Sequence, residues 1–403
     1  METVDQIVVV GASLGGIRTC QNLRREGFEG TLTLIGSEKH LPYDRPPLSK
    51  TMLSTDQDPG ELQLLPEDTF NDLDLNLLLG EPATSLDTDG RVVTVGGDQI
   101  RYDGLIISTG AAARKLPKTD GIAGVHVLRS LDDALAIRER LLPGASVVIV
   151  GAGFVGSEVA AAAAGRACEV TIVEAAKAPL IRGLGPAMGQ ACGDLHREHA
   201  VGLRLGVGIA SVLGSDEVEG VQLTDGSQLF ADLVVVGIGA HPNTEWLKGS
   251  GLQLDDGIVC NGTMNAGVPG VYAIGDVARA PNAWLGPSPV RMEHWTAVTE
   301  QAMLVARNLL HPQDSRVYDS VPFVWSDQYN DRIQVAGDTS GAEHVEVLVG
   351  SVDEQAFVTG YRRGDALAGV MALNSMRPFV QYRRLLMGHP SWEDALSLAA
   401  ELS

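Results

Sequence analysis

The chain has 403 residues, of which 44% are hydrophobic, and 30 basic against 51 acidic residues give it a formal net charge of −21. This length predicts two or three domains, each large enough to bury a core. The acidic balance argues against nucleic acid and anionic membranes as partners, and no apolar run of about 18 residues predicts a membrane span. No basic leader precedes the first strand, so we expect a cytoplasmic protein.

The side chains that could bind a metal or form disulfides are scattered. His196 and His199 lie on one expected helix, but no carboxylate or cysteine cluster completes a metal site, so we expect surface histidines and no bound metal. The cysteines form no C-x-x-C pair, which favours reduced thiols. They are Cys20, Cys168, Cys192 and Cys260.

Residues 6–36 predict a strand, a glycine-rich turn, a helix and a second strand. The apolar strand at residues 7–10 leads into GASLGG (residues 11–16), where Ser13 takes the place of the middle glycine of a G-x-G-x-x-G turn. Ser37 stands where an acid that binds a ribose is expected, and Glu38 follows it. This is an imperfect dinucleotide-binding fingerprint.

The segment LPYDRPPLSK (residues 41–50) comes next, and its paired prolines suit the first turn of a helix. Arg45 and Lys50 are placed to meet a phosphate or an electron-rich ring, or they are solvated charges on a surface turn. Short strands are expected at residues 75–79, 91–95 and 101–108, and a helix is expected at residues 131–141.

Residues 146–174 predict a second unit of the same kind with a complete fingerprint. A buried strand precedes GAGFVG (residues 151–156), and an alanine-rich helix follows. Gly151 permits the tight turn, Gly153 lets the backbone approach a pyrophosphate, and Gly156 lets the helix pack on the strand. The pyrophosphate would lie at the helix N-terminus, which favours anions.

Glu174 ends the second strand of this unit, where it would bind the hydroxyls of an adenosine ribose. It would also repel a 2′-phosphate by about 4 kcal/mol at about 4 Å and an effective dielectric constant of about 20. The pattern therefore favours NAD over NADP, although the nearby Lys177 weakens the preference.

The rest of the chain predicts a helix at 186–198 and strands at 202–213, 218–224 and 229–237. Asp276, after the short strand at residues 270–274, either binds a ribityl hydroxyl or caps a helix. Five strands from residue 321 and two closing helices then predict a separate α+β domain. These strands are expected at 321–329, 332–337, 345–350, 355–362 and 366–371, and the helices at 378–387 and 392–402.

Several segments together resemble one family. They are the two glycine turns, PYDRPPLSK (42–50), STG (108–110), GIGAHPN (237–243), AIGD (273–276), RMEHW (291–295) and WSDQY (325–329). Over nearly its whole length the chain resembles the FAD-dependent NADH:ferredoxin reductases that serve cytochrome P450 and ring-hydroxylating dioxygenase systems. These enzymes belong to the wider glutathione-reductase-like superfamily.

The resemblance implies an α/β fold with two Rossmann-like nucleotide-binding domains and a C-terminal α+β domain. The FAD-binding domain would comprise residues 1–115 and 245–320, and the NAD-binding domain residues 116–244. Residues 321–403 would cover the flavin and dock the partner. The protein would be a monomer or a weak homodimer.

The resemblance also implies the site residues. Lys50 would lie near the flavin ring, Phe154 would cover that ring until nicotinamide displaces it, and Glu158 would bind the carboxamide. The FAD contacts would be Gly11, Ser13, Gly15, Gly16, Ser37 or Glu38, Arg45, Lys50, Ala83, Arg129, Asp276 and Trp295. The NAD contacts would be Gly153, Phe154, Val155, Gly156, Glu158, Glu174 and Gly239.

The implied activity is hydride transfer from NADH to FAD, followed by transfer of single electrons to a [2Fe–2S] ferredoxin that supplies a P450 or a Rieske oxygenase. No cysteine lies within residues 40–50, where disulfide reductases and NADH oxidases of the superfamily carry theirs. The alternatives are a rubredoxin reductase and an NADH-sensing flavoprotein of the apoptosis-inducing-factor type.

An acidic ferredoxin would need a local basic cluster on this acidic chain. The candidates lie near the C-terminus, and they could equally form a solvated basic face. They are Arg362, Arg363, Arg377, Arg383 and Arg384. Trp295 and Trp325 are expected on the acceptor side of the flavin, although Trp325 could equally be a core residue.

Overall fold

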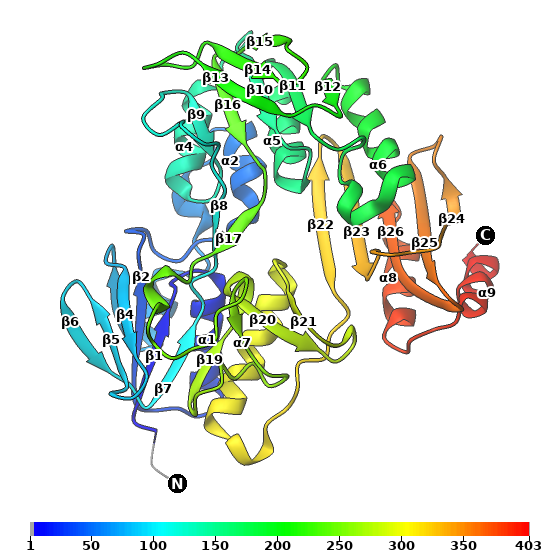
Figure 1. Ribbon diagram of the computed structural model, residues 1–403. Coiled ribbons are helices and arrows are strands. Elements are labelled where there is room, and N and C mark those ends of the chain that lie inside the picture. Colours follow the sequence, from blue (N-terminus) through cyan, green and yellow to red (C-terminus); the bar gives the residue numbers. More distant parts are fainter. Residues whose placement is uncertain (1–3, 403) are drawn as a thin grey trace. The chain divides into compact units, whose positions relative to one another are not determined.

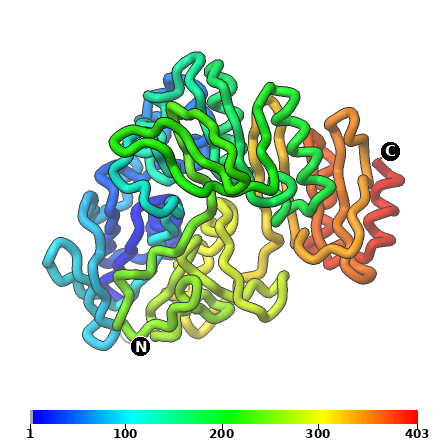
Figure 2. Tube along the Cα trace, turned by 45° about the horizontal axis from the view of Figure 1, so that its top comes forward, coloured from blue at the N-terminus to red at the C-terminus, as the bar shows by residue number. Residues whose placement is uncertain are grey.

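The computed structural model describes residues 4–402, and the chain forms two compact units. The first unit comprises the chain up to Asp44, Leu62–Ala112 and His241–Pro322. The second comprises Arg45–Glu61, Ala113–Ala240 and the chain from Phe323. Figure 1 labels the elements and Figure 2 traces the chain, which passes between the units near the short strands β8 (Ala111–Ala113) and β17 (Ala240–Pro242).

The first unit is built on a five-stranded parallel sheet with the order β19-β7-β1-β2-β3. Its central strands β7, β1 and β2 are mostly apolar and buried, because parallel strands are covered on both faces. Helices α1 (Leu14–Arg25) and α7 (Trp295–Leu310) pack against each other. The strands are β1 (Gln6–Val10), β2 (Thr31–Gly36), β3 (Leu75–Leu79), β7 (Gly104–Ile107) and β19 (Val271–Ala273).

Two small sheets and a short helix, α3 (Glu67–Asp72), complete the first unit. One sheet is antiparallel and consists of β4 (Ala83–Asp87), β5 (Val92–Val95) and β6 (Asp98–Arg101). The other consists of β18 (Ile258–Val259), β20 (Ala278–Asn282) and β21 (Gly286–Arg291).

The second unit contains a matching parallel sheet with the order β12-β11-β10-β16-β9. Its strands are β9 (Val125–Val127), β10 (Ser146–Val150), β11 (Glu169–Glu174), β12 (Gly202–Leu205) and β16 (Leu233–Val236). Helix α5 (Phe154–Gly165) packs on β10 and β11, while α4 (Leu131–Arg140) packs on β9 and β16. A small antiparallel sheet adds β13 (Ile209–Leu213), β14 (Gly220–Leu223) and β15 (Gln228–Phe230).

The chain from Phe323 forms an antiparallel sheet with the order β22-β23-β26-β25-β24 (Figure 1). Helices α8 (Met376–Leu386) and α9 (Trp392–Leu402) follow it and pack on it. The strands are β22 (Phe323–Gln328), β23 (Asp331–Gly337), β24 (His344–Ser351), β25 (Ala356–Arg363) and β26 (Ala366–Leu373). Together with the two parallel sheets, this confirms the predicted fold class.

The two faces of this antiparallel sheet contact different helices. Ile333, Phe357 and Met371 pack against α6 (Ile181–Glu198), which belongs to the same unit. On the other face, a Cβ added to Gly360 would meet Trp392 of α9, and Phe379 of α8 lies beside Phe323. Because strand residues alternate between faces, each residue of β22 faces either the α6 side or the α8 side.

Several element boundaries differ from the sequence-based expectation. The strand expected at 202–213 is two strands in different sheets, because Gly206 turns the chain with a φ of +73°. The helix expected from residue 186 is the second part of α6, which begins at Ile181 and is interrupted at Gly185 (φ +73°). Within residues 4–402, no helix is both long and apolar enough to cross a membrane.

His196 of α6 is buried, so the expectation that His196 and His199 both lie on the surface is wrong for His196. Its Nδ1 lies 2.8 Å from the hydroxyl of Tyr329, which follows β22, and His199 stacks on the same tyrosine ring. Burial, followed by the positive charge of His199 and Arg197, lowers the pKa of His196 to about 4. A pairing with a residue 133 positions away leaves no signal in the local sequence.

The burial of His196 predicts acid sensitivity. Its pKa in the folded protein lies below the unfolded value of 6.5, so the unfolded state binds the extra proton as the pH falls below about 6.5. Stability present at pH 7 is therefore lost toward pH 4. Between pH 7 and pH 5, the free energy of unfolding should fall by about 2 kcal/mol less in the His196→Gln variant than in the wild type.

Urea denaturation at both pH values measures this difference. His389→Gln, which changes an exposed histidine of the same unit, is the control. Equal acid sensitivity of His196→Gln and the wild type would show that His196 is not the group responsible.

Candidate functional site

The first glycine turn joins β1 to α1 at the carboxyl end of the central strand. Gly11 has a φ of +117°, and a Cβ there would lie 2.2 Å from the carbonyl oxygen of Ser108. A Cβ on Gly16 would lie 2.0 Å from the oxygen of Gly11, and one on Gly15 would lie 2.8 Å from Val298. The three glycines let the turn, α1, α7 and the segment after β7 pack closely.

Ser13 is the N-cap of α1 and has a φ of −122° and a ψ of −159°. This is extended backbone that any residue adopts, so serine at this position of the turn adds no backbone strain. The missing glycine therefore does not distort the fingerprint.

Of the two candidates for the ribose contact after β2, Glu38 has a side chain that is fixed by a hydrogen bond. Its Oε2 accepts a hydrogen bond from the hydroxyl of Tyr43 at 2.5 Å, and Tyr43 is buried. Ser37 is exposed. Tyr43 thus orients the carboxylate of Glu38 at the end of the strand.

The remaining predicted residues of the first unit lie at the ends of elements. Ala83 begins β4, and Asp276 lies in a short 3-10 turn, Gly275–Val277. Trp295 is the first residue of α7, and its Nε1 donates to Oδ1 of Asp44 at 2.8 Å. This hydrogen bond ties the start of α7 to the PYDRPP segment.

The second glycine turn, between β10 and α5, has the same geometry in the second unit. Gly151 has a φ of +100°, and a Cβ on Gly156 would lie 2.1 Å from the oxygen of Gly151. Gly153 is the N-cap of α5, and a Cβ there would have no atom of the described residues within 4 Å. The helix N-terminus is therefore open to a pyrophosphate, which the free N–H groups of its first turn would bind.

Glu174 is fixed beside this turn. Its Oε2 accepts from the backbone N–H of Ala152, and its Oε1 from that of Ala176, both at 2.8 Å. A carboxylate offers about four acceptor sites, so two sites are left for the hydroxyls of a ribose. The arrangement fits an adenosine ribose next to the glycine turn.

The centre of the site in the second unit is the buried carboxylate of Glu158, on the second turn of α5. Its Oε2 lies 2.7 Å from Nζ of Lys50 and also accepts from the hydroxyl of Ser49. Its Oε1 accepts from the hydroxyl of Ser326 on β22 at 2.7 Å. The structure thus brings together two predicted residues, Lys50 and Glu158.

The segment that carries Lys50 is held against α5 by several contacts. Helix α2 (Thr51–Ser54) packs on α4 and α5. Arg166, just after α5, donates to the carbonyl oxygen of Thr55 at 2.7 Å, and Arg138 donates to that of Gln57 at 3.0 Å. These contacts fix the segment that follows Lys50 to α4 and α5.

The structure places the other predicted residues of the second unit as follows. The Arg45 guanidinium donates to the carbonyl oxygen of Arg129, just before α4. Phe154 is half-buried and packs against the hydrophobic core that α6 forms with the C-terminal sheet. Val155 is exposed at the first turn of α5, and Gly239 follows β16 with a φ of +96°.

Ser49, Ser326, Gln328 and Tyr43 were not predicted from the sequence as site residues. Ser49 belongs to the PPLSK segment that drew attention to Lys50. The period-2 pattern of β22 would have placed Ser326 and Gln328 on one face. Nothing in the sequence indicates that this face meets α5.

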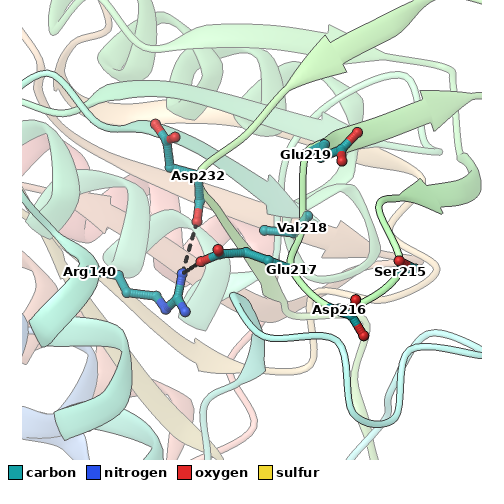
Figure 3. A pocket seen from close by; sticks show the side chains of 7 residues that line it. All are labelled: Arg140, Ser215, Asp216, Glu217, Val218, Glu219 and Asp232. Atoms are coloured by element: carbon teal, nitrogen blue, oxygen red, sulfur yellow. Dashed lines mark hydrogen bonds and ion pairs between the residues drawn. The ribbon is translucent and has the colours of Figure 1, made fainter.

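A hollow of about 480 Å³ in the second unit is not a candidate for the nicotinamide cofactor (Figure 3). Four carboxylates and one guanidinium surround it, and this excess of negative charge repels an anionic dinucleotide. None of the predicted site residues lines it. Its lining residues are Arg140, Ser215, Asp216, Glu217, Val218, Glu219 and Asp232.

The cysteines are unsuited to disulfide chemistry. All four are free, and burial raises the pKa of the Cys20, Cys192 and Cys260 thiols to about 12. Burial also raises the pKa of Cys168. Since the thiolate is the reactive form, the raised pKa values disfavour thiol chemistry at neutral pH.

Two glycine turns on parallel sheets, with a carboxylate at the end of each following strand, define a protein that binds two dinucleotides. The pyridine nucleotide-disulphide oxidoreductase family matches residues 5–302, and the reductase C-terminal family matches residues 323–399.

Rhodocoxin reductase from Rhodococcus erythropolis is 38% identical over 94% of this chain and 89% of its own length. Putidaredoxin reductase from Pseudomonas putida is 33% identical over 96% and 92%. The chain therefore belongs to the ferredoxin reductases within the pyridine nucleotide-disulphide oxidoreductase family, as the resemblance predicted.

Solved structures of ferredoxin reductases support the same family assignment. The chain of a covalent putidaredoxin reductase–putidaredoxin complex matches with a TM-score of 0.93 and 31% identity, over 99% of both chains. The ferredoxin reductase for the CYP199A2 system from Rhodopseudomonas palustris matches with a TM-score of 0.93 and 34% identity, over 99% of this chain and 100% of its own. Membership of this family implies FAD and NADH as cofactors.

The position of Glu174 predicts its effect on cofactor choice. Glu174→Gln removes the charge that repels a 2′-phosphate, so the kcat/KM ratio of NADPH to NADH should rise by about 10- to 100-fold once screening is allowed for. Steady-state kinetics with both nucleotides and ferricyanide measures the ratio.

Glu169→Gln is the matched control, because Glu169 lies exposed at the opposite end of the same strand. If the ratio is the same in Glu174→Gln and in the wild type, Glu174 does not discriminate between the nucleotides.

Proposed function

We propose that this protein is an NADH-dependent ferredoxin reductase that passes electrons singly to a [2Fe–2S] ferredoxin, which in turn supplies a cytochrome P450 or a Rieske oxygenase. The observation that carries the proposal is the ion pair of Lys50 with Glu158, in place of a redox cysteine pair, immediately after a dinucleotide-binding turn. The names of the relatives support a ferredoxin as the electron acceptor. Two relatives are named as reductases of rhodocoxin and putidaredoxin, and a third is the ferredoxin reductase component of chlorobenzene dioxygenase.

The residues of each unit fit one of the two cofactors. In the second unit, the open N-terminus of α5 would hold the pyrophosphate of NADH, and Glu174 would hold its ribose. In the first unit, the turn from Gly11 to Gly16 would hold the FAD pyrophosphate, and Glu38 would hold its ribose. We assign Lys50 to the flavin and Glu158 to the nicotinamide carboxamide, in line with the family resemblance.

When bound, FAD accepts a hydride from NADH and releases the two electrons one at a time. The chain itself supplies charge and geometry. The Lys50 ammonium lies 2.7 Å from Oε2 of Glu158 and balances the charge of this buried carboxylate, whose other oxygen can accept a hydrogen bond from the substrate. A carboxamide N–H that binds there orients the nicotinamide ring.

We further propose that the chain has three domains, one for each of FAD binding, NADH binding and partner docking. Residues 1–115 and 245–320 would bind FAD, 116–244 would bind NADH, and 321–403 would cover the flavin and dock the partner. The protein would act in the cytoplasm as a monomer or weak homodimer. Four free cysteines suit a reducing compartment.

Helix α8 offers a docking surface for an acidic ferredoxin. Arg377 and Arg384 are exposed on it, beside the exposed apolar side chains of Met376, Val380 and Met387. No acid lies among residues 376–390, in a chain whose net charge is −21. The α8 surface, as we call these five residues, combines a basic and an apolar character that suits an acidic protein partner.

The other candidate arginines contribute less. Arg362 pairs with Asp365, and Arg363 with Asp338, so their charges are compensated. Arg383 lies over the ring of Phe323, with its guanidinium carbon 4.3 Å from the ring centre, and Phe323 in turn stacks on Trp325. Arg383 therefore stabilises the aromatic side chains of β22.

The docking proposal predicts a selective loss of ferredoxin affinity. The double variant Arg377→Glu/Arg384→Glu should raise the KM for an acidic [2Fe–2S] ferredoxin by about tenfold or more, because it replaces two attractive charges by repulsive ones. The rate of NADH-dependent ferricyanide reduction should stay unchanged.

The double variant Arg25→Glu/Arg101→Glu changes two exposed arginines of the first unit, on α1 and β6, and is the control for the same change in net charge. If both variants shift the KM equally, the effect comes from net charge and the α8 surface has no special role.

The proposed function itself is tested by stopped-flow reduction of the FAD-loaded protein with NADH, followed by mixing with a [2Fe–2S] ferredoxin or a rubredoxin. We expect fast reduction and fast, one-electron bleaching of the ferredoxin. Preferential bleaching of rubredoxin would make the protein a rubredoxin reductase. A reduced complex that persists with both acceptors would overturn the proposal in favour of an NADH sensor.

A further inference from the structure

The carboxylate of Glu158 is held from two directions within the second unit. From one side, Lys50 and Ser49 contact its Oε2. From the other, the hydroxyl of Ser326 donates to its Oε1 across a sequence separation of 168 residues. Glu158 is 5% exposed and Ser326 is fully buried, so water competes little with these contacts.

A neighbour on the same strand determines where the Ser326 proton points. Nε2 of Gln328 lies 3.2 Å from Oγ of Ser326. An amide NH₂ only donates, so the Ser326 oxygen accepts from Gln328 and its single proton is left for Glu158. Gln328 is also fully buried, and its Oε1 has no hydrogen-bond partner among residues 4–402.

The three donors leave Glu158 with one defined acceptor site. A carboxylate offers about four lone-pair sites. Two on Oε2 are taken by Lys50 and Ser49, and one on Oε1 is taken by Ser326. Ser326 therefore sets the direction of the remaining lone pair on Oε1.

We propose that Ser326 and Gln328 are positioning residues for nicotinamide recognition: Gln328 orients the Ser326 hydroxyl, and Ser326 aims the free lone pair of Glu158 at the carboxamide N–H of NADH. The inference rests on the proposed function, which assigns the carboxamide to Glu158. It makes β22, the first strand of the C-terminal sheet, part of the selectivity for the reductant.

The test compares NADH with reduced 3-acetylpyridine adenine dinucleotide, in which a methyl group replaces the carboxamide NH₂ and cannot donate to Glu158. The kcat/KM ratio of the two nucleotides, measured with ferricyanide on the FAD-loaded protein, reports on this one hydrogen bond. Ser326→Ala should reduce the preference for NADH by about three- to tenfold, mainly by raising the KM for NADH. Ser326→Thr, which keeps a hydroxyl, should retain it.

Gln328→Glu gives an independent readout. At pH 8 the new carboxylate would accept the Ser326 proton and draw it away from Glu158, so the preference should fall. As the pH is lowered, the protonated carboxyl can donate to Ser326 as the amide does, and the preference should return. A merely structural role of Gln328 predicts no such recovery.

Thr359→Val is the matched control, since it removes another fully buried hydroxyl, bonded to Sδ of Met188, from the same sheet. A preference in Ser326→Ala equal to that of the wild type overturns the inference, and so does a wild type that does not discriminate between the nucleotides. Because ferricyanide is the acceptor, these outcomes do not depend on ferredoxin. Failure of ferredoxin reduction would instead overturn the proposed function.

Discussion

A buried carboxylate needs positive charge and hydrogen-bond donors around it, and much of the second unit is arranged so that Glu158 has both. Removing one partner of a buried ion pair typically costs about 3–5 kcal/mol, because the other charge is left uncompensated. Lys50 must therefore stay beside α5, and the arginines that fasten residues 51–57 to α4 and α5 keep it there. Ser326 joins the C-terminal sheet to the same carboxylate.

The two glycine turns show which parts of a fingerprint are conformational requirements. Gly11 and Gly151 have positive φ angles and close contacts that exclude any side chain. The middle position differs: both Ser13 and Gly153 have extended backbone with negative φ. Serine is tolerated there because the position needs a small residue and does not need a left-handed backbone.

Much of the fold could be predicted because strands buried on both faces leave unbroken apolar runs, as at β1, β10 and β16. The β20–β21 hairpin was missed, since Pro281, Pro287 and Pro289 within it oppose a strand assignment. Helix α7 was also missed. Its buried residues Ala302, Val305, Ala306 and Leu309 recur at helical spacing, so this helix could have been predicted from the local pattern.

The candidate site was predictable to the extent that its chemistry is local. The glycine turns, Glu174 and the PPLSK segment could be found because their spacing follows from the geometry of one strand and one helix. The contact of Ser326 with Glu158 and the burial of His196 beneath Tyr329 could not, because each joins segments more than 130 residues apart. Tyr43, five residues from Glu38, is the one partner that a closer reading of the sequence could have found.

The lack of acids on α8 has a consequence for the kinetics of encounter. Two acidic proteins repel each other at long range through their net charges, while the proposed α8 surface would attract an acidic partner only over short distances. Salt screens the long-range term first, because the Debye length is about 10 Å at 0.1 M ionic strength and about 3 Å at 1 M. If an acidic acceptor docks on the α8 surface as proposed, its association should therefore become faster as salt is first added and slower at high salt.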